Sequence, residues 1–226
     1  MMIESVKSKI IPTHFLMSIP VIALFINNII LPAIALEPQV IQNRSVKFIV
    51  KIGGDYGGTG FFIRKYNNRY TILTNRHVVQ NCDSYCLLTT FDGNNYGFSS
   101  ENVRYFPGID LAEVDIDTDI NYPVATLSNK NKIVPGSLVY TYGWNAVGTR
   151  LKSRGLQWLD GKVTGELPTY NSSEGYSLAY TLAQIPGLSG SPLLNEDGEV
   201  IGIYGSGERD SIGLGIIIST YRNSNY

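Results

Sequence analysis

The strongest constraint on the fold is a series of short apolar or alternating segments, each ended by glycine, proline, asparagine or aspartate. Residues 46–52, for example, alternate and stop at Gly53-Gly54, and residues 70–74 follow a turn at Asn67-Asn68. Short strands at spacings of about 8–12 residues are typical of β-sandwiches and β-barrels. A content of 23 Gly in 226 residues, with only 16% charged residues, agrees with a β-rich globular protein. We therefore predict an all-β fold.

The segments form two groups, which predict two six-stranded antiparallel β-barrels. The first group covers about residues 40–126, where residues 122–127 are expected to be the closing strand. The second group covers about residues 135–222. No internal repeat at a period of 20–50 residues is visible, so the sequence does not predict a solenoid or a propeller.

The N-terminal residues 1–35 predict an export signal. Two lysines, Lys7 and Lys9, precede a nearly continuous apolar run, and residues 33–35 read Ala-Ile-Ala, a small-residue cleavage pattern. We therefore expect a signal peptide and a secreted or periplasmic protein. The alternative is an uncleaved membrane anchor, because the run is long enough to span a bilayer as a helix.

The cysteines, the charge and the histidines limit the classes of partner. In an oxidising compartment Cys82 and Cys86 are expected to form a disulfide. A formal net charge of −1, with no basic patch, argues against nucleic acid as a partner. The two histidines are His14, inside the signal, and His77, so no Cys/His zinc set can be assembled and we predict no metal and no cofactor.

One stretch could carry a nucleophile. Residues 185–194 read Ile-Pro-Gly-Leu-Ser-Gly-Ser-Pro-Leu-Leu, which places Ser189 in a glycine-rich turn before an apolar run. A serine hydroxyl is a weak nucleophile and needs a base, together with donors for the oxyanion that forms. Gly187 and Gly190 allow a sharp turn that points successive N–H groups at one spot. Taken alone, the stretch favours an ordinary Gly/Ser/Pro turn between two strands.

The base for Ser189 would be His77, the only imidazole that remains after signal removal. It follows an apolar strand, and residues 75–79 are expected to form a single helical turn. The base needs a carboxylate on its other ring nitrogen. Asp110 is our choice because its apolar neighbours predict partial burial; the full set of candidates between His77 and Ser189 is Asp83, Asp92, Asp110, Asp115, Asp117, Asp119 and Asp160.

Residues 73–79, 109–112 and 187–192 together resemble the motifs of the trypsin-like serine peptidases, which have the chymotrypsin fold. They occur in the family's His, Asp, Ser order, and residues 200–203 resemble the small exported bacterial branch. The resemblance implies a peptidase domain over residues 36–226, with its active site in the cleft between two barrels. It implies a serine endopeptidase (a hydrolase). Ser189 would attack the peptide carbonyl to form an acyl-enzyme, His77 would transfer protons, and Asp110 would orient His77. The backbone N–H groups of Gly187 and Ser189 would form the oxyanion hole.

The same resemblance implies substrate-binding roles for Ala183, at the floor of the primary pocket, and for the pocket wall Gly205, Ser206 and Gly207. Cleavage after Lys or Arg requires Asp where Ala183 stands, so we expect no strong preference for basic side chains. The expected partner is a peptide or protein substrate, with a membrane involved only if the N-terminal segment is uncleaved. We expect a monomer. The alternative function is a catalytically silent homologue that acts as a protein-binding module, although the complete His, Asp, Ser set argues against it.

Overall fold

The structure is a computed structural model that describes residues 35–53, 57–82, 84–130, 133–148, 153–168, 173–207 and 212–224. The predicted signal peptide lies almost entirely in residues 1–34, outside the described residues, and so does Asp83. No helix within the described ranges is long and apolar enough to cross a membrane.

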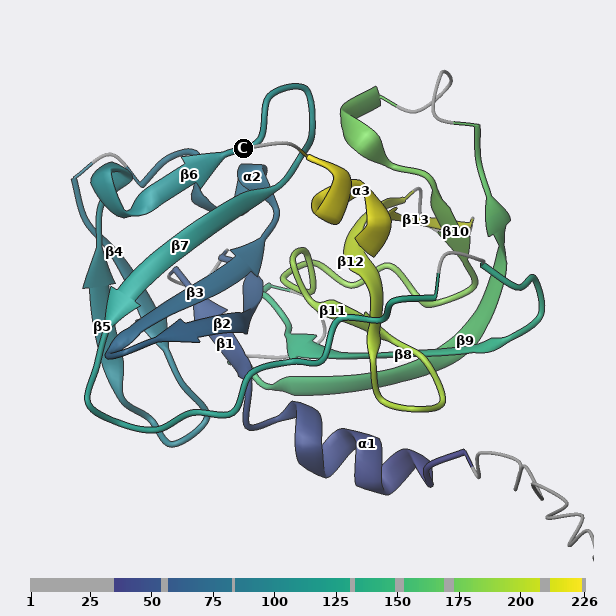
Figure 1. The fold of residues 1–226 in the computed structure, drawn as a ribbon, viewed down its shortest axis with the longest axis horizontal. Helices are drawn as coiled ribbons and strands as arrows, with labels where there is room; N and C mark the ends of the chain where they lie inside the picture. Colours follow the sequence, from purple (N-terminus) through teal and green to yellow (C-terminus); the bar gives the residue numbers. More distant parts are fainter. Residues whose placement is uncertain are drawn as a thin grey trace, which may run out of the picture. The chain divides into compact units, whose positions relative to one another are not determined.

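The first half of the described chain forms a seven-stranded antiparallel sheet, drawn at the left of Figure 1. Its strand order is β5-β4-β1-β2-β3-β7-β6, so that the hairpin of β2 and β3 lies near the centre. The strands are β1 Ile49–Ile52, β2 Thr59–Tyr66, β3 Arg69–Thr74, β4 Cys86–Thr89, β5 Asn95–Phe98, β6 Val103–Tyr105 and β7 Ala112–Asp117.

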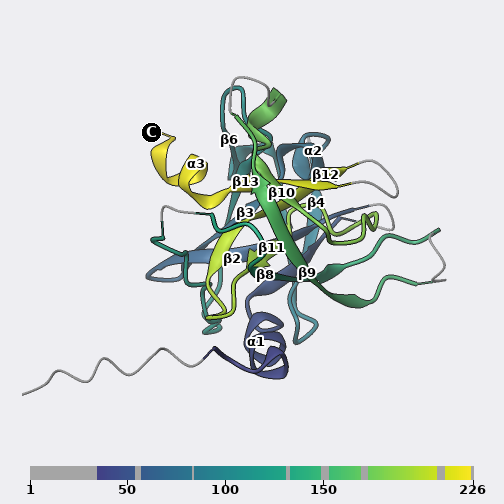
Figure 2. The ribbon, with the colours of Figure 1, turned by 90° about the vertical axis from the view of Figure 1, so that its right-hand side faces the viewer.

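The second half forms a closed barrel of six strands in the order β10-β13-β12-β11-β8-β9. Figure 2 shows this barrel facing the viewer. The long strand β9 pairs with both β8 and β10, which closes the barrel. The strands are β8 Leu138–Trp144, β9 Leu156–Glu166, β10 Leu178–Tyr180, β11 Pro192–Leu194, β12 Val200–Gly207 and β13 Gly213–Ile217.

The all-β prediction is confirmed, but the prediction of two six-stranded barrels is correct only for the second. The first sheet has seven strands and is not closed by hydrogen bonds among the described residues. Residues 122–127 do not form the expected closing strand, because their hydrogen-bonding groups bind elsewhere. Ala125 N donates to Phe62 O at 2.8 Å, and Val200 N of the second barrel donates to Thr126 O at 2.8 Å. The edge strands β5 and β6 are joined end to end by the short helix η1 (Ser100–Asn102) and do not pair.

Three short α-helices and a second 3-10 turn complete the described fold: α1 Pro38–Ser45, α2 Arg76–Val79, α3 Ile218–Asn223 and η3 Ser173–Gly175. The predicted helical turn around His77 is confirmed as α2. The other two α-helices were not predicted. In α1 the buried residue Ile41 packs into the core near Gly198, in the turn between β11 and β12. α3 follows β13 directly, and its Tyr221 is buried.

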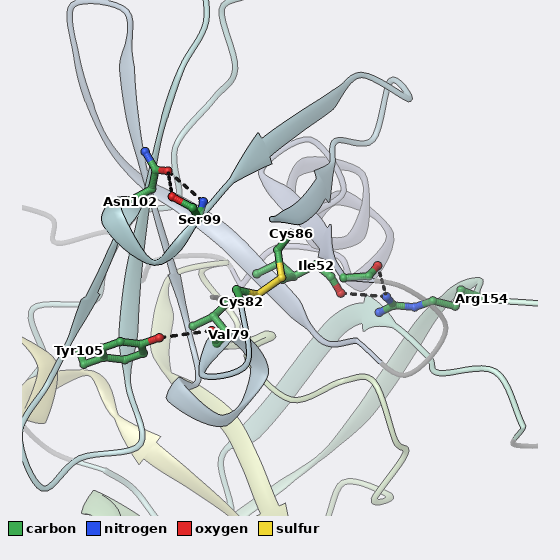
Figure 3. Close-up of a disulfide and its surroundings, with 9 residues drawn as sticks. Ile52, Val79, Cys82, Cys86, Ser99, Asn102, Tyr105 and Arg154 are labelled. Atoms are coloured by element: carbon green, nitrogen blue, oxygen red, sulfur yellow. Dashed lines mark hydrogen bonds between the residues drawn. A yellow bond between two sulfur atoms is a disulfide. The ribbon is translucent and has the colours of Figure 1, made fainter. Parts of the chain in front are cut away.

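The predicted disulfide between Cys82 and Cys86 is present, with 5.4 Å between the two Cα atoms (Figure 3). It joins the segment that follows α2 to the first residue of β4. Figure 3 also shows Tyr105 of β6 donating a hydrogen bond to Val79 O, the last residue of α2, at 3.3 Å. The turn that carries His77 is thus fixed at its C-terminal end by a covalent link and by a neighbouring strand.

Candidate active site

His77 and Asp110 meet at one edge of the seven-stranded sheet. His77 lies in α2, directly after β3, and Asp110 lies just before β7, the strand paired with β3. The imidazole Nδ1 is 2.6 Å from Asp110 Oδ2, and the backbone N of His77 donates to Asp110 Oδ1 at 2.9 Å. Asn75 Nδ2 donates to Asp110 O at 2.9 Å, which fixes the main chain of the two segments together.

Burial and hydrogen bonding act on Asp110 in opposite directions. The Asp110 side chain is 4% exposed, whereas that of His77 is 42% exposed. Burial alone raises the pKa of a carboxyl group, but hydrogen bonds from His77 and Tyr176 outweigh it and hold the pKa of Asp110 below its ordinary value. Asp110 is therefore a charged carboxylate at neutral pH, with its Oδ2 directed at the imidazole.

Ser189 lies in the loop between β10 and β11 of the barrel, and three backbone N–H groups next to it or close by have carbonyl partners. Those of Leu188, Gly190 and Ser191 donate to backbone oxygens at 2.9–3.2 Å. In contrast, the N–H groups of Gly187 and Ser189 donate no hydrogen bond to any described residue. Gly187 has a φ of +94°, a conformation that side-chain-bearing residues rarely adopt.

The structure brings the serine loop to the His77 turn. A Cβ placed on Gly190 would lie 3.2 Å from the backbone N of Asn75, two residues before His77. Between the described side chains of Ser189 and His77 no hydrogen bond is formed. Catalytic hydrogen bonds are often long in unliganded enzymes and tighten only with substrate, so the lack of this bond is compatible with a nucleophile and its base.

Thr59, a residue that was not predicted from the sequence, connects the serine loop to the first sheet. Its hydroxyl donates to Gly187 O at 3.0 Å and accepts from the backbone N of Trp144 at 2.9 Å. Its backbone N donates to Ser189 O at 2.9 Å. The side chain is fully buried. Thr59 therefore fixes two carbonyl groups of the loop, which orients the peptide units around Ser189.

A second connection between the two halves is made by Arg154, which precedes β9. Its guanidinium donates to Ile52 O at 3.0 Å and to Gly58 O at 2.8 Å in the first half, and to Asn145 O at 2.9 Å in the second. Figure 3 shows this side chain reaching the end of β1 at Ile52. No short motif marks Arg154 in the sequence, because the three bonds named above go to backbone carbonyls, which every residue type carries.

The predicted pocket residues lie at the C-terminal end of β12 and in the segment before Ser189. Gly205, Ser206 and Gly207 are the last residues of β12, and Ala183 is exposed. The side chain of Gln184, which was not predicted, lies against the end of β12 and the start of β13. A Cβ on Gly207 of β12 would lie 2.7 Å from Gln184 Cδ, and one on Gly213 of β13 would lie 2.2 Å from Gln184 Nε2. The role of these residues in binding substrate stays a prediction.

The remaining described aspartates have other partners or lie in solvent. Asp92 accepts from Tyr122, Asp115 from Thr71, and Asp117 pairs with Arg69 at 3.0 Å. Asp119 accepts from Asn68, and Asp160 is exposed. Among the described residues no group of three or more His, Cys, Asp or Glu side chains is placed to hold a metal ion.

A fold of this topology, with His77, Asp110 and Ser189 at the junction of its two halves, defines the class of chymotrypsin-like proteins. The family described as "Trypsin-like peptidase domain" matches residues 58–203, a stretch that includes all three residues. The chain therefore belongs to the trypsin-like peptidase family, as its motifs predicted.

Two of the similar proteins are named as bacterial serine proteases. "Serine protease Do-like HtrA" of Bacillus subtilis is 30% identical over 166 residues, which cover 71% of this chain and 36% of the relative. "Putative serine protease HhoA" of Synechocystis is 34% identical over 176 residues, covering 71% and 39% respectively. The chain thus spans well under half the length of these relatives.

Solved structures show the same fold. The crystal structure of Deg5 superimposes with a TM-score of 0.64 at 21% identity and covers 83% of this chain and 93% of that protein. "HtrA-type protease AlgW with tripeptide" superimposes with a TM-score of 0.65 at 22% identity, covering 82% and 61%. At this level of identity the likeness supports the fold alone.

Proposed function

We propose that this protein is an exported serine endopeptidase that hydrolyses peptide bonds through an acyl-enzyme on Ser189. The observation that carries the proposal is the contact of His77 with the buried carboxylate of Asp110, where β3 ends and β7 begins, close to the serine loop. Asp110 sets the tautomer of the imidazole and stabilises its protonated form. His77 removes the Ser189 proton during attack and returns it to the leaving amine.

The oxyanion hole is assigned to the N–H groups of Gly187 and Ser189. Two observations support this: both N–H groups lack a partner among the described residues, while their neighbours in the loop are bonded. Thr59 holds the Gly187 and Ser189 carbonyls in place. Donors that are fixed before the reaction stabilise a developing oxyanion without reorganisation in the transition state. The active site would then lie in the cleft between the sheet and the barrel.

The substrate class and the location rest on the sequence and on the relatives. "Probable periplasmic serine endoprotease DegP-like" of Chlamydia muridarum is 31% identical over 165 residues, covering 71% of this chain and 31% of that protein. The structure of AlgW holds a tripeptide, by its description. Together with the apolar N-terminal segment, these support an extracytoplasmic enzyme that acts on peptides or proteins.

The test is labelling of the purified protein by a fluorophosphonate, which phosphonylates an activated serine. We expect the wild type to be labelled, and Ser189→Ala and His77→Ala to show no label. Ser191→Ala is the matched control: this buried serine is two positions away, its hydroxyl has no partner among the described residues, and its loss should leave labelling intact. A folded wild type that takes up no label would favour the silent binding module.

Removing the Thr59 hydroxyl should impair both stability and labelling. Thr59→Val keeps the shape but leaves Gly187 O and Trp144 N without their partner, so we expect a loss of about 1–3 kcal/mol in the free energy of unfolding and slower labelling. Thr59→Ser keeps the hydroxyl and is the control. Equal labelling rates of the two variants, measured under conditions where both are folded, would show that the hydroxyl does not shape the loop.

A further inference from the structure

The carboxylate of Asp110 has a second side-chain partner besides His77. The hydroxyl of Tyr176 donates a hydrogen bond to Asp110 Oδ2, the oxygen that also contacts His77 Nδ1. Tyr176 is 7% exposed and Asp110 is 2% exposed. The carboxylate is therefore held from two sides: by α2, through the imidazole and the backbone N of His77, and by the segment that leads into barrel strand β10.

The main chain around Tyr176 is fixed on the same aspartate. The backbone N of Asp110 donates to Glu174 O at 2.8 Å, and the Glu174 carboxylate pairs with Arg76 of α2 at 3.4 Å. Glu174 has a φ of 58°, a left-handed conformation that is unfavourable for a residue with a side chain. Such a conformation persists only where the surrounding structure holds it. It lies two residues before Tyr176, whose hydroxyl reaches the buried carboxylate of Asp110.

Gly205 makes room for the Tyr176 ring. A Cβ on Gly205 would lie 2.0 Å from Tyr176 Cε1 and 2.9 Å from its Cζ. Any side chain at position 205 would therefore displace the ring and with it the hydroxyl. The glycine at the end of β12, predicted above to line the substrate pocket, is thus also required for the contact between Tyr176 and Asp110.

The protonation states suit a permanent donor and acceptor. Burial raises the pKa of Tyr176 far above its ordinary value, and the hydrogen bond to Asp110 raises it further, so the hydroxyl keeps its proton. Burial acts on Asp110 in the same direction, but the bonds from His77 and Tyr176 outweigh it and keep the carboxylate charged. If the buried carboxylate lost one of these donors, the cost of burying its charge would be offset less, and the carboxylate would rotate more freely.

We propose that Tyr176 is a positioning residue of this site: its hydroxyl, supplied by the barrel half, fixes the Asp110 carboxylate in the orientation that His77 needs. Gly205 contributes to this arrangement because its lack of a side chain leaves space for the Tyr176 ring. The inference rests on the proposed peptidase function, since it assigns how the aspartate of that site is held. Tyr176 acts through Asp110 and His77, without contact with the substrate.

The test compares Tyr176→Phe with Tyr221→Phe in the hydrolysis of p-nitrophenyl acetate. Tyr221 is a matched control: it is 6% exposed, and its hydroxyl donates at 2.7 Å to Glu113, a buried carboxylate on β7 outside the site. Both variants keep the ring and lose a hydrogen bond to a buried carboxylate, and Tyr221 also interacts with Arg64, so the melting temperature of Tyr221→Phe should fall at least as far as that of Tyr176→Phe. We expect Tyr176→Phe to lower kcat about tenfold with KM unchanged, and Tyr221→Phe to leave both constants near the wild-type values.

The outcomes separate this inference from the proposed function. Equal kcat values for the two folded variants would overturn the role of Tyr176 while leaving the peptidase assignment intact. An increase in KM without a fall in kcat would also overturn it, because loss of orientation at Asp110 affects the chemical step. If the folded wild type neither turns over the ester nor takes up the fluorophosphonate, the proposed function itself fails.

Discussion

Replacing Asp110 by asparagine is expected to lower the kcat of ester or peptide hydrolysis by about 10⁴-fold, the size of effect that this substitution has in Ser-His-Asp sites. In the structure Oδ2 accepts from both His77 Nδ1 and Tyr176, while Oδ1 accepts from the His77 backbone. An amide in this position has one NH₂ group that can only donate, so one of the two faces loses its acceptor. If that face is Oδ2, the imidazole is left in the wrong tautomer. The measurement is steady-state kinetics on the purified variant.

The control for Asp110→Asn is Asp115→Asn, which alters another aspartate of the same chain segment. Asp115 lies in β7 and accepts a hydrogen bond from Thr71 at 2.7 Å, without contact to His77. It should retain wild-type kcat. A variant Asp110→Asn that turns over within about tenfold of the wild type would contradict the assignment of Asp110 as the orienting carboxylate.

Acid should remove the contribution of Asp110 to stability. The pKa of this carboxyl is below its ordinary value in the folded state, so the folded protein favours the charged form more than the unfolded chain does. The resulting stabilisation is complete above a pH of about 4. It is lost as the pH falls through the folded-state pKa. The difference in unfolding free energy between wild type and Asp110→Asn should therefore narrow on acidification.

Gly187→Ala is expected to abolish labelling, with a loss of at least about 10²-fold in the labelling rate. The added Cβ would lie 2.2 Å from the backbone N of Ala146 and 2.6 Å from Trp144 O, closer than any packing allows. The φ of +94° adds a backbone cost that glycine alone avoids. The loop must therefore move, which displaces the N–H groups assigned to the oxyanion hole. The readout is the fluorophosphonate labelling rate of a folded sample.

Gly136→Ala separates the backbone cost from the displacement. Gly136 also has a positive φ, +87°, but a Cβ there would meet no atom within 4 Å. It carries the conformational cost in an open position ahead of β8, so its labelling rate should match the wild type despite a small loss of stability. If Gly187→Ala is labelled at the normal rate, the reaction does not require the N–H groups of residues 187 and 189 to be held by the present loop conformation.

The sequence was sufficient to predict features that depend on a local pattern, or on there being a single residue of the required type. The turn at α2 and the hairpin of β11 and β12 follow from strand periodicity and turn residues. The contact of His77 with Asp110 could be predicted because only one imidazole remained and one aspartate had apolar neighbours. The closure of the first barrel could not be predicted, because whether residues 122–127 pair as a strand depends on which distant groups accept their hydrogen bonds.

The residues that support the site carried no such signal. Thr59, Arg154 and Tyr176 act mainly on groups that are distant in the chain, and an isolated threonine, arginine or tyrosine is common in any β-rich sequence. Helix α1 was missed for a related reason. It is eight residues long, and of its apolar side chains Ile41 is buried, so docking on the folded core rather than helix propensity stabilises it.

The hydrogen bonds made by Thr59 also determine the stage of folding at which the proposed catalytic centre can form. The hydroxyl of Thr59 and the carbonyl of Gly187 are separated by 128 positions in the chain. Closing a loop of that length costs entropy before any contact rewards it, so such contacts form late. A molecule whose second half has not yet folded lacks the segment that completes the centre. Peptidase activity would thus arise only in molecules whose two halves have both folded.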